Sequence, residues 1–165
     1  MEFAKKIKIY LDTSVFSYLK QDDSPEKTKA TNDFWNQLKE RQNNDVEIYL
    51  STVTIKELND CFEPKRTFML EKLKEINFIL LEVNEKNEEM AKQIIELGIL
   101  TEKSRDDCLH ISAAVFAECD YIASWNFKHL VNVKTINGVR AITNLKGFRQ
   151  IDIISPEMFV DGGSK

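Results

Sequence analysis

The sequence is short of cysteine and of long apolar runs. Its three cysteines, Cys61, Cys108 and Cys119, are odd in number and far apart, and they lack the close pairs that a zinc site uses. No stretch of about 18 apolar residues is present to span a bilayer, and residues 1–6 lack the long apolar region of a signal peptide. These absences predict a cytoplasmic protein with no membrane partner, in a compartment where thiols stay reduced.

Glycine and proline are also scarce, with five and three residues, which leaves little room for flexible linkers. None of the glycines falls in a G-x-G-x-x-G or G-x-x-x-x-G-K-[ST] pattern, so the usual phosphate-binding loops are excluded. A chain of 165 residues is the normal size of one domain. We expect a single domain over residues 1–160, followed by a disordered tail over residues 161–165.

Positive charge and histidine are limited too. The net charge is −4 and the isoelectric point is about 5.3, which argues against a protein that coats nucleic acid through bulk charge. A nuclease remains compatible, because a carboxylate cluster that holds divalent cations needs only a local rim of Lys and Arg to contact phosphates. The only histidines are His110 and His129, and no Ser-His-Asp or Cys-His arrangement stands out.

What the sequence does contain is a regular alternation of strand-like and helix-like segments. Residues 7–12 alternate with period two, placing Ile7, Ile9 and Leu11 on one side, as a strand does. Residues 120–124 are apolar enough for a strand buried on both faces. The strands that we expect cover residues 7–12, 46–50, 78–81, 120–124 and 151–154.

Helical spacing fills the intervals between these strands. Pro25 suits a first helical turn, Gly98 suits a helix C-terminus, and Asn137-Gly138 is expected to interrupt the helical pattern of residues 127–147. The expected helices lie between residues 25 and 42, 51 and 58, 64 and 73, 84 and 97, and 104 and 116. This order predicts a three-layer α/β/α domain, with a mostly parallel sheet of about five strands and helices on both faces.

Four polar residues lie near the expected carboxyl ends of strands or at a helix start. Asp12 and Asn126 follow the first and fourth strands, Glu57 lies about two helical turns beyond the second, and Asp107 opens a helix. Ligands of parallel sheets bind outside the carboxyl ends of the strands. Carboxylate and amide oxygens are the ligands that Mg²⁺ and Mn²⁺ prefer, so the pattern predicts a divalent-cation site at one mouth of the fold.

Each of these acids also has a structural interpretation. Asp12 is equally suited to cap the helix that follows the first strand, and Glu57 alone is more typical of a solvated helix residue. Asp107 stands three residues after Ser104, in a pattern that fits a capping box. Its neighbour Asp106 is turned about 100° around the helix and is not chosen.

Four further residues near these motifs are more typical of the protein interior than of the site. His110 lies one turn beyond Asp107 on the same face, so it is a supporting candidate, although a satisfied core histidine is the commoner case. Trp125 and Phe127 fit the core better than a platform for base stacking. Cys108 fits a small buried hydrophobe.

The order and spacing of the motifs resemble the PIN-domain family, which includes the VapC-like toxin ribonucleases. Residues 11–15, Leu-Asp-Thr-Ser-Val, look like its first motif, and residues 51–58, Ser-Thr-Val-Thr-Ile-Lys-Glu-Leu, like its second. Residues 107–114 start on an acid and look like the third. Residues 124–129 stand where the family commonly has a hydroxyl residue followed two positions later by a fourth acid, and residues 154–157 resemble its closing strand.

The resemblance implies a catalytic triad of Asp12, Glu57 and Asp107 that binds Mg²⁺ or Mn²⁺. Asn126 stands in place of the fourth acid, so it is expected as a neutral metal ligand that removes one negative charge. Members with this Ser-Trp-Asn variant form a branch of the family, and we expect weaker or fewer bound metals than in a four-acid relative. Supporting roles fall to Thr13, Ser14, His110 and Ser124. Phosphate contacts are expected from Lys103, Arg105, Lys128 and Lys134, which flank the third and fourth motifs.

Three hypotheses follow from these residues. The first is a metal-dependent endoribonuclease that hydrolyses RNA through a metal-activated water, with an antitoxin protein and a homodimer as partners implied by the resemblance. The second is a PIN fold with an eroded metal site that acts as a protein- or RNA-binding module. The third is a phosphotransfer domain with Asp12 as nucleophile, although that chemistry usually needs a second acid where Ser14 stands.

Overall fold

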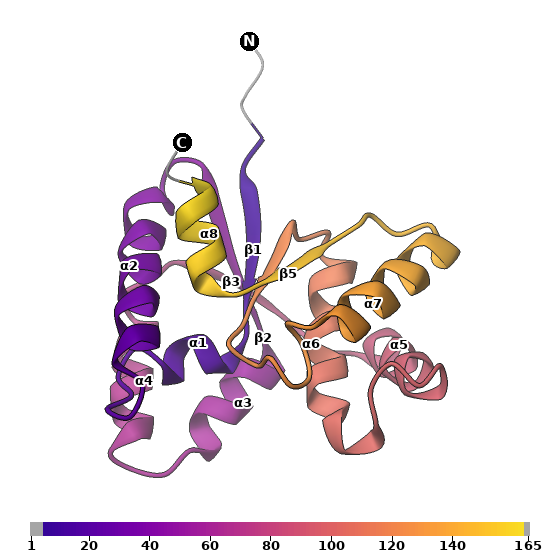
Figure 1. Cartoon of the computed structure of the whole chain (residues 1–165), viewed down its shortest axis with the longest axis horizontal. Coiled ribbons are helices and arrows are strands. Elements are labelled where there is room, and N and C mark those ends of the chain that lie inside the picture. The colour runs from indigo at the N-terminus through magenta and orange to yellow at the C-terminus, as the bar shows by residue number, and fades with distance from the viewer. Residues whose placement is uncertain (1–4, 164–165) are drawn as a thin grey trace.

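The computed structural model describes residues 5–163 and contains one five-stranded sheet with all strands parallel (Figure 1). The strand order is β3-β2-β1-β4-β5. Ile9 of β1 therefore lies opposite Ile48 of β2 and Tyr121 of β4. The strands are β1 (Ile7–Leu11), β2 (Val46–Ser51), β3 (Phe78–Leu81), β4 (Tyr121–Ala123) and β5 (Asp152–Ile154).

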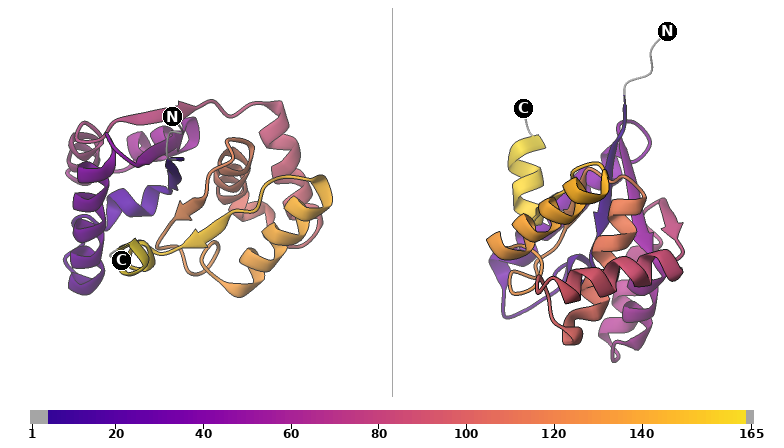
Figure 2. Two further views of the ribbon diagram at one scale, coloured as in Figure 1. Left: turned by 90° about the horizontal axis from the view of Figure 1, so that it is seen from above. Right: turned by 90° about the vertical axis from the view of Figure 1, so that its right-hand side faces the viewer.

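Helices lie on both faces of this sheet, as Figures 1 and 2 show from three directions. One group contains α1 (Thr13–Ser17), α2 (Pro25–Arg41), α4 (Lys65–Leu73) and α8 (Pro156–Gly163). The opposite group contains α5 (Glu85–Glu96), α6 (Arg105–Phe116) and α7 (Val133–Lys146). The helix α3 (Thr52–Asp60) follows β2 directly, and a 3₁₀ turn, η1 (Glu102–Ser104), precedes α6.

The alternation of side chains along β1 divides the core into two layers. Ile9 and Leu11 point to one face and pack in the cluster that includes Phe34 and Trp35 of α2. Tyr10 points to the other face and packs with residues of α5, α6 and α7. Because successive strand residues face opposite sides, a single central strand supplies both layers. The expected three-layer α/β architecture with a parallel sheet is therefore confirmed.

Three local expectations are wrong. The helix α7 runs without a break through Asn137-Gly138. The capping box at the start of α6 does not form, because the Ser104 side chain makes no capping hydrogen bond. Phe127 is 44% exposed, whereas Trp125 is buried as expected.

Other expectations match the structure or fall at its limits. Gly98 stands just beyond α5 with a positive φ of 76°, a backbone conformation that glycine adopts without strain. Cys108 is fully buried, and all three cysteines are free. The tail expected over residues 161–165 overlaps α8, and residues 164–165 lie outside the described part of the chain. Within residues 5–163, no helix has both the length and the apolar character needed to cross a bilayer.

Candidate functional site

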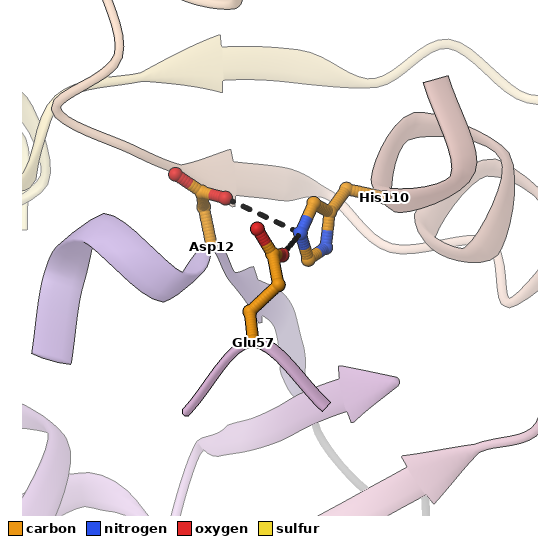
Figure 3. A group of neighbouring side chains, drawn as sticks. All are labelled: Asp12, Glu57 and His110. Atoms are coloured by element: carbon orange, nitrogen blue, oxygen red, sulfur yellow. Dashed lines mark hydrogen bonds and ion pairs between the residues drawn. The ribbon is translucent and has the colours of Figure 1, made fainter. Parts of the chain in front are cut away.

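The candidate site lies at the carboxyl ends of β1 and β4, beside α3 and α6. Asp12 follows β1 directly, Glu57 projects from α3, and His110 projects from α6 (Figure 3). One ligand atom from each of these three side chains lies within 4.8 Å of the others. The parallel order of the sheet produces this convergence, because it brings the carboxyl ends of neighbouring strands to the same edge.

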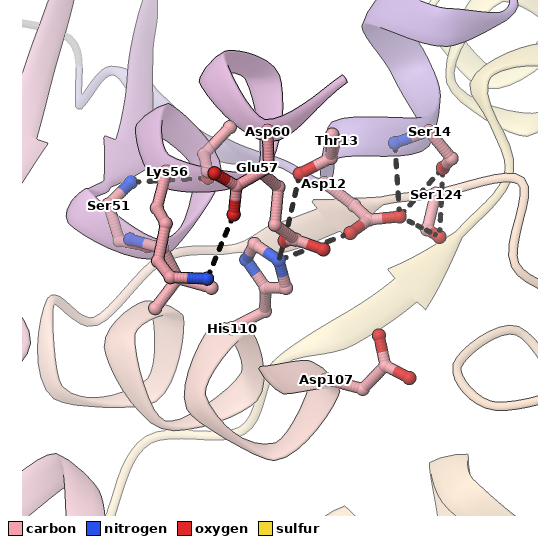
Figure 4. Close-up of polar contacts among 12 residues, drawn as sticks. Asp12, Thr13, Ser14, Ser51, Lys56, Glu57, Asp60, Asp107, His110 and Ser124 are labelled. Atoms are coloured by element: carbon pink, nitrogen blue, oxygen red, sulfur yellow. Dashed lines mark hydrogen bonds and ion pairs between the residues drawn. The ribbon is translucent and has the colours of Figure 1, made fainter. Parts of the chain in front are cut away.

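Asp12 is buried and held by hydroxyl groups. Its Oδ2 accepts hydrogen bonds from Ser14 Oγ at 2.7 Å and from Ser124 Oγ at 2.8 Å (Figure 4). It also accepts a long bond from the Ser14 backbone N at 3.4 Å, so Asp12 does cap α1. Its other oxygen, Oδ1, faces His110 Nε2 at 3.5 Å. Thus Asp12 Oδ2 caps α1, while Asp12 Oδ1 faces the candidate site.

Glu57 is oriented by two partners and remains partly open to solvent. Its Oε1 accepts a hydrogen bond from Thr13 Oγ1 at 3.0 Å and forms a short contact with His110 Nε2. The Glu57 side chain is 31% exposed, whereas the His110 side chain is completely buried. Glu57 therefore forms the solvent side of the cluster and His110 its floor.

His110 is linked to the interior through a chain of hydrogen bonds. Its Nδ1 lies 2.5 Å from Tyr10 Oη, which in turn lies 2.7 Å from Ser51 Oγ and 3.3 Å from Thr54 Oγ1. Complete burial alone would lower the pKa of His110. The electrostatic effects of Tyr10, Glu57 and Asp12 outweigh burial and hold this pKa well above its ordinary value. The two carboxylates therefore favour the protonated form of the His110 imidazole.

Asp107 lies beside the cluster rather than inside it (Figure 4). Its Oδ2 lies 3.0 Å from His129 Nδ1, within hydrogen-bonding distance. Burial raises the pKa of Asp107 and the nearby charge of Asp12 raises it further, while His110 and His129 oppose the shift without cancelling it. Asp107 therefore takes up a proton more readily than an ordinary aspartate does.

The Asn126 side chain takes part in a local turn. Its Oδ1 accepts a hydrogen bond from the His129 backbone N at 2.9 Å, and Asn126 is not a member of the three-residue group. Its backbone N donates to Ser124 Oγ at 2.9 Å. The loop after β4 thus holds both Ser124 against Asp12 and His129 near Asp107. The metal-ligand role expected for Asn126 stays a prediction.

The four basic candidates differ in their surroundings. Arg105 forms a short ion pair with Glu88 and a longer one with Glu102 at 3.7 Å, so its charge is already opposed by acids. Lys128 and Lys134 line a cavity of about 260 Å³ together with His129. Lys103 is exposed on the η1 turn. Lys128 and Lys134 therefore lie next to His129, the hydrogen-bond partner of Asp107.

Sequence reasoning missed Tyr10, Ser51 and His129 as parts of this network. The alternation of β1 already placed Tyr10 on the face opposite Ile9, which is the face that α6 covers. Nothing in the sequence indicates that its hydroxyl meets His110, because that contact spans 100 residues of chain. His129 was noticed only as one of two histidines.

The donor set suits a divalent cation. Atoms bound to one cation at about 2.1 Å lie at most about 4.2 Å apart, so a small movement of the side chains brings Asp12, Glu57 and His110 to bonding distance. Two carboxylates with one imidazole suit Mn²⁺ at least as well as Mg²⁺, because imidazole is a good ligand for transition metals. Binding through His110 Nε2 replaces its contact with Glu57 and requires that the imidazole be neutral.

Of the comparisons with known proteins, the one with solved structures supports this architecture. No family model matches the chain, and no curated protein is similar to it in sequence. A solved structure of VapBC2 from Rickettsia felis, bound to a DNA fragment from their promoter, contains a similar chain. The similarity covers 90% of this chain and 98% of that chain, with a TM-score of 0.54 and 14% sequence identity. At this identity the likeness is one of fold, and the parallel sheet with its flanking helices is consistent with a PIN-like fold.

Proposed function

We propose that this protein is a metal-dependent endoribonuclease with Asp12, Glu57 and Asp107 as its catalytic acids. The observation that carries the proposal is the convergence of Asp12, Glu57 and His110 at the carboxyl edge of the sheet. The fold of the whole chain is similar to that of a chain in the VapBC2 structure. Asp12 and Glu57 would hold Mg²⁺ or Mn²⁺, with His110 as an additional ligand and Asn126 and Asp107 nearby. When bound, the cation supplies an activated water and offsets charge on the phosphodiester.

The chain's own residues position these groups. Ser14 and Ser124 fix Asp12 through its Oδ2, which leaves Oδ1 directed at the site. Thr13 orients Glu57. Asp107 has a raised pKa and a histidine partner, features that suit a group which takes a proton during hydrolysis. The RNA backbone would lie along Lys103, Lys128 and Lys134.

A cleavage assay with matched variants tests the proposal. Purified wild type, Asp12→Asn, Glu57→Gln and Asp107→Asn are incubated with a labelled single-stranded RNA and Mn²⁺, and the products are resolved on a denaturing gel. We expect each variant to lose at least about a hundredfold in rate, because removing one catalytic charge or proton acceptor has effects of this order.

The matched control is Asp106→Asn, which removes the same charge one residue from Asp107 on an exposed side of α6. It should cleave like the wild type. Equal cleavage by the wild type and Asp12→Asn would contradict the proposal and point to a contaminating nuclease.

A second candidate function is a protein- or RNA-binding module without catalysis. Two observations favour it: His110 Nε2 is already engaged by Glu57, and Asn126 Oδ1 is already engaged by the His129 backbone. Calorimetric titration with Mn²⁺ separates the two functions. Saturable binding that is lost in Asp12→Asn supports the nuclease, and its absence at millimolar metal supports the module.

Partners follow from the same proposal. The similar chain comes from a complex named VapBC2, so an antitoxin-like protein is the proposed partner of this chain. We also propose a homodimer. Sedimentation velocity of the purified chain tests the dimer, and co-purification with the product of an adjacent small gene tests the antitoxin; a monomer at micromolar concentration or the absence of any co-purified chain would refute the respective proposal.

A further inference from the structure

Lys27 and three aromatic side chains form a cluster that the proposed catalytic residues do not use. The Lys27 Nζ lies 5.3 Å from the ring centre of Tyr18, 5.6 Å from that of Trp125 and 5.2 Å from that of Phe127. The rings contact one another, with centre separations of 5.9 Å for Tyr18 and Trp125 and 6.0 Å for Trp125 and Phe127. We call these four residues the aromatic cluster.

The aromatic cluster lies beside the candidate site of Asp12, Glu57 and His110. The Trp125 backbone N donates to Ser14 Oγ at 2.9 Å, and the same Ser14 hydroxyl donates to Asp12. Phe127 also lines the cavity of about 260 Å³ that contains His129, the partner of Asp107. A ligand in this cavity that lies against Phe127 is therefore next to His129, the partner of Asp107.

The cluster combines a fixed base with an exposed ring. Trp125 is 5% exposed and is anchored by a hydrogen bond of 2.8 Å from its Nε1 to Thr31 Oγ1. Phe127 packs edge-on against it and is 44% exposed. A rigid support under an exposed aromatic ring is what a stacking contact requires, since little side-chain freedom is lost on binding.

Lys27 provides the charge. It is half-buried, and within residues 5–163 it has no acidic partner, unlike Lys29 on the same helix, whose Nζ lies 2.9 Å from Asp33. The rings attract its ammonium group but cannot neutralise it. An anionic ligand such as a phosphate would complete this site.

We infer that the aromatic cluster binds one unpaired nucleotide of a single-stranded RNA beside the cleaved bond, with its base on Phe127 and its phosphate on Lys27. The inference rests on the proposed function and names the substrate class of the same site. Bases in a duplex are already stacked on their neighbours, so only an unpaired nucleotide can place its face on a side chain. A protein partner at this ring is the competing outcome.

The test is an anisotropy titration of a fluorescein-labelled single-stranded RNA and of the corresponding duplex, in EDTA so that no cleavage occurs. We expect the wild type to prefer the single strand. Phe127→Ala should weaken single-strand binding about tenfold and leave duplex binding unchanged, because stacking of one base contributes an effect of this order. Phe127→Tyr should bind the single strand like the wild type. This would show that the loss in Phe127→Ala comes from the missing ring and not from a change in the fold.

Lys27→Gln has a separate signature. Loss of one phosphate contact should reduce the slope of log affinity against log salt by about 0.7 for a single strand. Lys29→Gln on the same helix and Phe62→Ala, which removes another aromatic side chain that is 90% exposed, are the matched controls and should behave like the wild type.

The outcomes separate this inference from the proposed function. Single-strand affinities that are unchanged in Phe127→Ala, equal losses for the duplex, or the absence of saturable wild-type binding would each overturn the inference and favour a protein at the ring. RNA binding at Phe127 without any cleavage in Mn²⁺ would instead refute the nuclease and leave only the binding of an unpaired nucleotide at the aromatic cluster.

Discussion

Glu75 is a single side chain that joins α2 to the end of α4. It accepts hydrogen bonds from Trp35 Nε1 at 3.1 Å and Lys39 Nζ at 3.3 Å, and it pairs with Lys72 at 3.3 Å. Burial tends to raise the pKa of Glu75, but the bonds from Trp35, Lys39 and Lys72 outweigh it and lower this pKa. The folded state therefore binds the Glu75 proton less readily than the unfolded chain does, so Glu75 stabilises the protein above the unfolded pKa and loses this effect as the pH falls.

We expect Glu75→Gln to be less stable than the wild type at pH 7 by about 0.5–1 kcal/mol, a value kept small because the carboxylate is partly solvent-screened. The difference should shrink as the pH falls below about 4.3, where the unfolded carboxylate takes its proton. Urea unfolding followed by tryptophan fluorescence at both pH values measures it. A difference that is constant with pH would show that the charge of Glu75 is not involved.

Single residues also show how much of the candidate site could be predicted from the sequence. That Asp12 and Glu57 approach each other follows from the strand-end rule, because it needs only the parallel order of β1 and β2. The sequence favoured Asp107 as their third neighbour, whereas His110 is the third member of the group in the structure. Both lie on one face of α6, and the rotation of α6 is set by its buried side chains, including Cys108 and Ile111.

At the scale of an element, α7 shows why the Asn137-Gly138 prediction was wrong. In the structure the glycine serves close packing rather than a turn. A Cβ added at Gly138 would lie 2.6 Å from Ile99 Cγ1 and 2.7 Å from Ile99 Cγ2, so α7 can approach the chain beyond α5 only because residue 138 has no side chain. A turn signal and a packing signal use the same residue type, and only the tertiary neighbour distinguishes them.

Gly138→Ala should therefore be less stable than the wild type by about 1 kcal/mol. Helix propensity favours the alanine by about 1 kcal/mol, but overpacking against Ile99 costs about 1–3 kcal/mol. The matched control is Asn137→Ala at the exposed neighbouring position, which should gain about 0.5 kcal/mol from propensity alone. Chemical denaturation measures both. An equal gain in the two variants would mean that the contact at Ile99 is not tight.

At the scale of the whole molecule, the fold was the most predictable level. Five strands that alternate with helices can form only a few sheet arrangements. Crossover connections are right-handed, and helices must cover both faces of the sheet. The order β3-β2-β1-β4-β5 did not follow from any local pattern, because the pairing of β1 with β4 joins residues more than one hundred positions apart. Long-range order is decided by the packing of complete faces, which no single segment encodes.

The proposed cation should stabilise the whole fold, since a ligand that binds only the folded state raises its stability. At a metal concentration of about one hundred times the dissociation constant, the gain is about 2.7 kcal/mol, which for a chain of this size raises the melting temperature by about 5–10 °C. We expect this shift with Mn²⁺ for the wild type and for Asp106→Asn, and its loss in Asp12→Asn. Scanning calorimetry with and without Mn²⁺ checks it, and an equal shift in Asp12→Asn would place the cation elsewhere.

The central position of β1 also has a consequence for synthesis. Asp12 lies near the start of the chain, yet its hydroxyl partner Ser124 is 112 residues away, and β1 pairs with β4 on one side. While the ribosome is still producing α5 and α6, β1 has only β2 beside it. At that stage the candidate site lacks Ser124 and His129. Contacts of such long separation form slowly. A ribosome-bound fragment that stops before β4 should therefore lack a complete candidate site, so translation itself delays the assembly of that site until most of the chain has emerged.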